Sequence, residues 1–109
     1  MSVYDHEAAL ARVGGDADLL REIAGLFEMD CPQALEKLRE AIDSGDTREA
    51  HRLAHGLKGS AANFGATPAV DAAFRIEQLA RDGKLGEIDG LLETLERALD
   101  TLRSELKEV

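Results

Sequence analysis

The sequence has few of the residues that build crosslinked, aromatic-rich or membrane-spanning folds. Its single cysteine, Cys31, excludes an internal disulfide and a cysteine-rich metal site, so we expect a reducing compartment. Tryptophan is absent, and aromatic residues make up only 4% of the chain. No segment approaches the roughly 20 consecutive apolar residues of a membrane span, and the start "MSVYDHEAAL" does not resemble a signal peptide. These absences predict a soluble, cytoplasmic protein.

Positive charge is also scarce. Lysine and arginine total 13 against 22 acidic residues, which gives a net charge of −9. A protein of this charge is repelled by phosphate backbones and anionic lipids, so we expect neither nucleic acid nor a membrane as a partner. The 44% hydrophobic content is dominated by alanine and leucine, which favours closely packed helices. A length of 109 residues predicts one domain, residues 1–109.

Glycine, proline and capping residues divide the chain into helices. Asp5 is placed to cap a short first helix that ends near Val13. A long second helix is expected from Asp16 to Gly45, kinked or briefly broken near Pro32. Its apolar stripe has spacings of three and four: Leu20, Ile23, Phe27, Cys31, Ala34, Leu38 and Ala41.

The second half of the chain shows two more helix starts. The "DTRE" segment at 46–49 is a capping-box pattern, and it opens a helix that we expect to end near Gly65. Thr67 then has the character of a cap, with Pro68 in the first turn of a helix that runs to Gly83.

The last segment carries an unbroken apolar seam with spacings of four and three: Ile88, Leu92, Leu95, Leu99, Leu102, Leu106 and Val109. Such a seam fits either a coiled-coil dimer or the inside of an antiparallel bundle. The short loops and the other amphipathic helices favour the bundle. We therefore predict an all-α, up-down-up-down four-helix bundle with a short extra N-terminal helix, and we expect a monomer.

One histidine is predicted to face outward from the middle of a helix. On a helical wheel, the core side of the segment carries Leu53, Leu57 and Phe64, opposite His55. Around His55 lie Arg48, His51, Arg52, Lys58, Gly59 and Ala62. A merely solvated face has no reason to prefer glycine, which weakens a helix, whereas a face approached closely by a partner does. This pattern indicates a nucleophilic imidazole in a docking surface, with Lys58 able to neutralise an anion placed there.

A carboxylate on the next helix needs a partner. Glu77 falls on the apolar side of that helix, among Val70, Ala73, Phe74 and Ala80. It can pair with Arg81, four residues later. Alternatively, it can reach the neighbouring helix and accept a hydrogen bond from an imidazole, which would fix the tautomer and leave the other ring nitrogen free to react. The sequence leaves both possibilities open.

The segment "AHGLKGSAANFGA" at 54–66 resembles the signature of histidine-containing phosphotransfer (HPt) domains. "VGGDADLLREIAGLF" and "AIDSGD", which precede it, also resemble that family, so the similarity covers essentially the whole chain. The resemblance implies a four-helix bundle in which His55 takes a phosphoryl group from one receiver-domain aspartate and passes it to another.

The resemblance also implies a role for individual residues. Lys58 matches the basic residue beside the phosphoryl group, Gly59 the small residue that keeps the imidazole accessible, and Glu77 a residue near the imidazole. Ser60 and Gly65 match positions that look structural, whereas Gly56 stands where a larger residue is usual.

The implied partners are response-regulator receiver domains and a hybrid sensor histidine kinase. The Mg²⁺ that catalyses transfer would belong to the receiver domain, so no cofactor is expected in this chain. Nothing in the sequence resembles an ATP-binding loop, and we predict a phosphocarrier rather than an enzyme.

Two other functions remain as alternatives. His51 and His55 stand four residues apart, which is a known spacing for metal ligands, although the sequence "HRLAH" lacks the glutamate of the "HExxH" arrangement and offers no convincing third ligand beside them. A helical interaction module without any chemistry is the other alternative.

Overall fold

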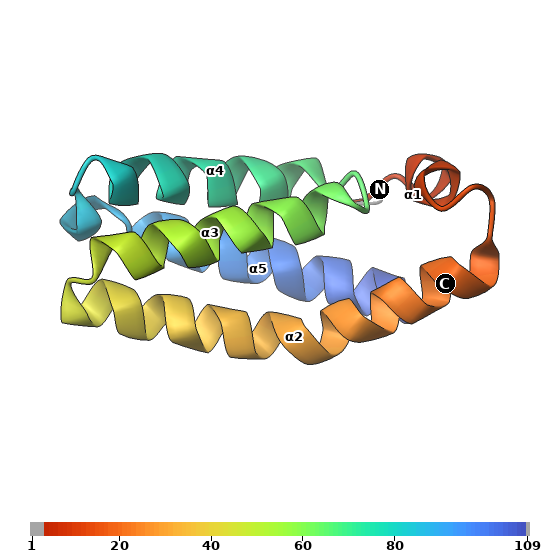
Figure 1. Ribbon diagram of the computed structural model, residues 1–109, viewed down its shortest axis with the longest axis horizontal. Helices are drawn as coiled ribbons and strands as arrows, with labels where there is room; N and C mark the ends of the chain where they lie inside the picture. Colours follow the sequence, from red (N-terminus) through yellow and green to blue (C-terminus); the bar gives the residue numbers. More distant parts are fainter. Residues whose placement is uncertain (1–3, 109) are drawn as a thin grey trace.

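The computed structural model describes residues 4–108, and these fold into an elongated helical bundle of 41 × 23 × 21 Å. The four long helices run alternately up and down beside one another, and the short first helix lies at one end (Figure 1). This arrangement confirms the predicted fold class. The elements are α1 (His6–Arg12), α2 (Ala17–Ser44), α3 (Thr47–Ala62), α4 (Thr67–Arg81), the 3-10 turn η1 (Leu85–Glu87) and α5 (Asp89–Leu106).

Aspartates begin the first three helices as predicted. The carboxylates of Asp5, Asp16 and Asp46 each accept a hydrogen bond from a backbone N–H three residues later, at 3.0, 3.1 and 3.1 Å. The predicted cap of α4 is wrong. Thr67 is already the first helical residue, Ala66 occupies the cap position, and no side chain caps this helix. Pro68 lies in the first turn, where its missing N–H costs no helical hydrogen bond.

The long helix α2 is not interrupted at its proline. It continues for 28 residues with Pro32 inside it, and it bends near its middle (Figure 1). Proline removes one backbone hydrogen bond and crowds the preceding turn, so a bend without a break is the milder of the two expected outcomes. As a result, α2 offers one continuous face to both α3 and α5.

The seam of α5 lies inside the bundle, as expected for the antiparallel arrangement. Its six described members from Ile88 to Leu106 are all buried, whereas Val109 lies outside the described residues. The predicted stripe of α2 needs a correction at two positions. Ala24 and Leu35 are buried there, while Ile23 and Ala34 are only partly buried, because they lie at the edge that borders α3.

Alanines make up most of the interface between α3 and α4. The buried ones are Ala50, Ala54 and Ala61 on α3, and Ala69, Ala72, Ala73 and Ala80 on α4. Side chains this small let two helices approach closely. The close approach brings polar side chains at the outer edge of α4 within reach of α3, and that edge carries the site described next.

Candidate functional site

His55 lies on the outer face of α3, as the helical wheel predicts. Its side chain is 64% exposed, whereas Leu53, Leu57 and Phe64 on the opposite face are buried in the core. The imidazole is therefore fixed to a rigid helix and open to an approaching molecule.

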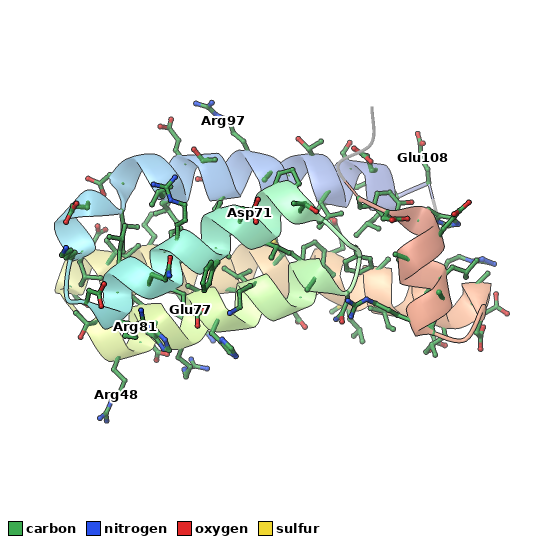
Figure 2. All side chains as sticks on the ribbon, turned by 90° about the horizontal axis from the view of Figure 1, so that it is seen from above. Arg48, Asp71, Glu77, Arg81, Arg97 and Glu108 are labelled. Carbon is green, nitrogen blue, oxygen red and sulfur yellow. The ribbon has the colours of Figure 1, made fainter. Side chains whose placement is uncertain are left out.

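Glu77 of α4 lies against this imidazole. Its carboxylate is only 13% exposed, and its Oε2 atom lies 3.1 Å from Nδ1 of His55. Figure 2 shows the Glu77 side chain where α4 faces α3. The alternative partner, Arg81, contacts Asp82 instead, at 3.7 Å. Of the two possibilities left open by the sequence, the structure shows the contact between helices.

Lys58 holds the other oxygen of the same carboxylate. Its Nζ atom lies 2.7 Å from Oε1 of Glu77 and 5.1 Å from the centre of the Phe74 ring. The Lys58 side chain is 25% exposed, so it is less free than a surface lysine. Phe74, which we predicted on the apolar face of α4, is 45% exposed and packs under this ammonium.

The surroundings of Glu77 keep its carboxyl group ionised. Burial by itself raises the pKa of Glu77, but hydrogen bonds and charge from Lys58 and His55 outweigh it, and the net pKa lies below the ordinary value. An ionised carboxylate can only accept hydrogen bonds, so Nδ1 of a neutral His55 must carry the proton. The lone pair of that ring is then on Nε2, which the contact with Glu77 does not use.

His51 is closer to this cluster than its prediction as a docking residue implies. Its Nε2 atom lies 3.6 Å from the same Oε2 atom of Glu77. The rings of His51 and His55 are nearly parallel, with centres 6.4 Å apart and an angle of 10° between their planes. Two imidazoles therefore face one carboxylate oxygen.

The remaining predicted docking residues lie on the outer side of α3. Arg48 points away from the bundle (Figure 2), and Arg52 is exposed and paired with Glu49. Ala62 is half-buried. A Cβ atom on Gly59 would meet no heavy atom within 4 Å beyond its own helical neighbourhood, so no adjacent helix requires a glycine there.

Gly65 has the structural role that its motif position suggested. Its φ of 60° lies in the left-handed region, which ends the turn after α3 at low cost only for glycine. A Cβ atom there would also lie 3.0 Å from Cβ of Asp5. The chain before α1 therefore packs directly on this turn, where Asp5 N–H donates to the Phe64 carbonyl at 2.9 Å.

A groove between α2 and α3 was not predicted from the sequence. Gly56 and Ser60 of α3 line it, together with Ile23 and Leu26 of α2. Leu26 is 59% exposed, and nearby Met29 on α2 is 67% exposed. Both residues fall outside the apolar stripe of α2. Large apolar side chains on an otherwise charged helix face are the signal that could have revealed this surface.

Within residues 4–108, no three histidine, cysteine, aspartate or glutamate side chains are arranged to hold a metal ion. The same part of the chain contains no helix that is both long and apolar enough to cross a membrane.

Comparison with known proteins gives the family. The sequence model of the Hpt domain family matches residues 22–105 of this chain. The chain belongs to the Hpt domain family. Histidine phosphotransfer in a two-component relay is accordingly the role of this Hpt domain.

Two solved structures are similar to this Hpt domain along nearly its whole length. Histidine-containing phosphotransfer protein B (HptB) from Pseudomonas aeruginosa PAO1 is 26% identical with a TM-score of 0.88, and the match covers 96% of this chain and 91% of that one. The HPT domain of a sensor hybrid histidine kinase from Shewanella is 17% identical with a TM-score of 0.83, covering 97% and 92%, and supports the fold alone. No curated protein matches the Hpt domain significantly.

Proposed function

We propose that this Hpt domain is a phosphorelay intermediate with His55 as the phosphoacceptor. The observation that carries the proposal is the contact of Nδ1 of His55 with Glu77 at 3.1 Å, on a ring that is 64% exposed. The hydrogen bond fixes the reactive tautomer, and the exposure gives a partner access to Nε2.

The transfer step follows from this geometry. The Nε2 lone pair of His55 attacks the phosphorus of an aspartyl phosphate on a receiver domain, and the bond from phosphorus to the aspartate oxygen breaks. The aspartate leaves as a carboxylate. The positive charge that develops on the imidazole is stabilised by Glu77 through the Nδ1–H hydrogen bond. The reverse of these events, with a second receiver domain, passes the phosphoryl group on.

Lys58 contributes charge to the product. A phosphoryl group carries about −1.5 to −2 charges near pH 7, and it would stand close to the ionised Glu77. The Lys58 ammonium, 2.7 Å from that carboxylate, neutralises part of the combined charge. The Mg²⁺ and the acidic pocket that activate the phosphoryl group belong to the receiver domain in this proposal, so the chain acts as a carrier without an ATP site.

The docking surface of the receiver domain is proposed to extend over both α3 and α2. Gly59 leaves open space beside His55, and Gly56 leads from His55 into the groove toward α2. The exposed side chains of Leu26 and Met29 offer apolar area at this edge, next to the charged face of α3. Residues 1–109 would act here as one domain and as a monomer.

Incubation with a phosphorylated receiver domain tests the proposal. The wild-type protein should gain a phosphate that is labile in acid and stable in base, whereas His55→Gln should gain none and keep its helical circular dichroism. His6→Gln, which changes the histidine on α1, is the matched control and should be phosphorylated normally. An interaction module without chemistry would bind the receiver domain and gain no phosphate.

A further inference from the structure

The proposed function leaves one close contact of the site without a role. The chain has three histidines, and two of them face the same atom. Oε2 of Glu77 lies 3.1 Å from Nδ1 of His55 and 3.6 Å from Nε2 of His51. An oxygen already holding one imidazole in a fixed tautomer is thus within reach of a second donor.

We propose that His51 is a positioning residue that shares Glu77 with His55, and that its protonation raises the phosphoryl occupancy of His55. This inference rests on the proposed function of His55. It goes beyond that function because it makes the relay sensitive to a second histidine that never carries the phosphoryl group.

The first consequence of protonating His51 concerns Glu77. A neutral His51 can place a lone pair on Nε2, which Oε2 of Glu77 does not attract. A protonated His51 has a proton on both nitrogens, so its charge attracts Oε2 across 3.6 Å, while the Nδ1–H group of His55 keeps its hydrogen bond to the second lone pair of the same oxygen. The Glu77 carboxylate then has two cations beside it, Lys58 and the protonated His51.

The second consequence is electrostatic. A phosphoryl group on His55 adds negative charge near a ring whose centre is 6.4 Å from that of His51. A proton on His51 is therefore bound more tightly when His55 is phosphorylated, and by linkage the phosphorylated state is favoured when His51 is protonated. After screening by salt, charges at this separation shift an equilibrium roughly two- to threefold.

The other charges around His51 stay constant over the relevant pH range. On α3 these are Arg48, Arg52 and Lys58, and on α4 they are Arg81 and the ionised Glu77. Arginine and lysine do not titrate near neutral pH, and the lowered pKa keeps Glu77 charged there. Imidazole is the side-chain type whose ordinary charge change falls near neutral pH, so a comparison between pH 6 and pH 8 is the one that tests the two rings.

The contact itself is tested on the unphosphorylated protein by following the imidazole signals in an NMR pH titration. The chemical shifts of the His55 ring should also follow the protonation of His51, because both rings face one carboxylate oxygen. His51→Gln should remove this dependence and change the His55 titration curve. Identical His55 curves in wild type and His51→Gln would overturn the sharing of Glu77.

The effect on occupancy is tested by equilibrating each protein with a phosphorylated receiver domain at pH 6 and pH 8. The ratio of wild-type to His51→Gln occupancy should be roughly two- to threefold higher at pH 6 than at pH 8. His51→Lys, which is charged at both pH values, should keep high occupancy throughout. The same ratio at both pH values overturns the inference but not the proposed function, whereas absence of phosphate on wild-type His55 overturns both.

Discussion

Gly59 offers a test in which stability and transfer should change in opposite directions. A glutamine at this position replaces a poor helix former by a good one, and its Cβ atom meets no neighbouring helix within 4 Å. Because Gly59 lies in the last turn of α3, we expect a gain of about 0.5 kcal/mol rather than the full difference between the two residues. For a domain of this size, the gain corresponds to a rise in Tm of about 2–4 °C.

Phosphotransfer to the same variant should become slower. The new side chain would stand beside His55, where, in the proposed function, a receiver domain brings its aspartyl phosphate to Nε2. Ordering or displacing one flexible side chain costs about 0.5–1.5 kcal/mol, and the steric obstruction adds to it. We therefore expect the transfer rate to fall about tenfold or more. Thermal denaturation and rapid-quench transfer, measured on one sample, give both quantities.

Gly25→Gln is the matched control for this experiment. Gly25 is an exposed glycine inside α2, and a Cβ atom there likewise meets nothing within 4 Å. It lines a hollow toward α5 rather than the groove toward α3. The control should gain at least as much stability, because Gly25 lies in a helix interior, and it should transfer at the wild-type rate. A Gly59→Gln protein that transfers as fast as this control would refute the access argument, and one with a lower Tm would show that Gly59 is needed for packing.

Three further outcomes are expected around Glu77. Lys58→Ala should slow transfer and lower the free energy of unfolding by about 1 kcal/mol, because the largely buried Glu77 carboxylate loses its cation. Unchanged transfer kinetics would remove Lys58 from the mechanism. Glu77→Ala should alter the NMR titration of His55, and an identical curve would show that the hydrogen bond is absent in solution. The lowered pKa of Glu77 means that its stabilising effect is present above about pH 4.5 and is lost as pH falls through the folded-state pKa. Glu77→Gln should therefore lose less stability than wild type on acidification, which chemical denaturation at pH 3 to 6 can measure.

The features that the sequence predicts well are those that depend on neighbours along the chain. Asp5, Asp16 and Asp46 cap their helices because the bond joins residues three apart. The outward position of His55 follows from the helical period, which alone separates it from Leu53 and Leu57. The exception is the start of α4, where Ala66 rather than Thr67 holds the cap position and no side chain caps the helix; Pro68 in the first turn has no N–H group that needs one.

The features that remained open or were wrong depend on how the helices approach each other. Glu77 had two possible partners because the rotation of α4 against α3 is set by the packed alanines, not by local pattern. Phe74 lies just outside that interface, so it packs under Lys58 instead of entering the core. The groove beside Leu26 is lined by residues of both α2 and α3, so no residue pattern within one helix specifies it.

The alanine interface between α3 and α4 has a consequence for how relays of this kind can diversify. The distance between His55 and Glu77 depends on how closely α3 and α4 pack. Buried residues such as Ala54 and Ala73 determine this packing, and a partner cannot reach them. Arg48 and Leu26, in contrast, stand on the surface and hold neither the imidazole nor the carboxylate. Substitutions at such surface positions can change which receiver domain is recognised while the reacting ring keeps its orientation. In the proposed function, partner choice therefore depends on exposed residues and the chemistry on buried ones, so that one can change without the other.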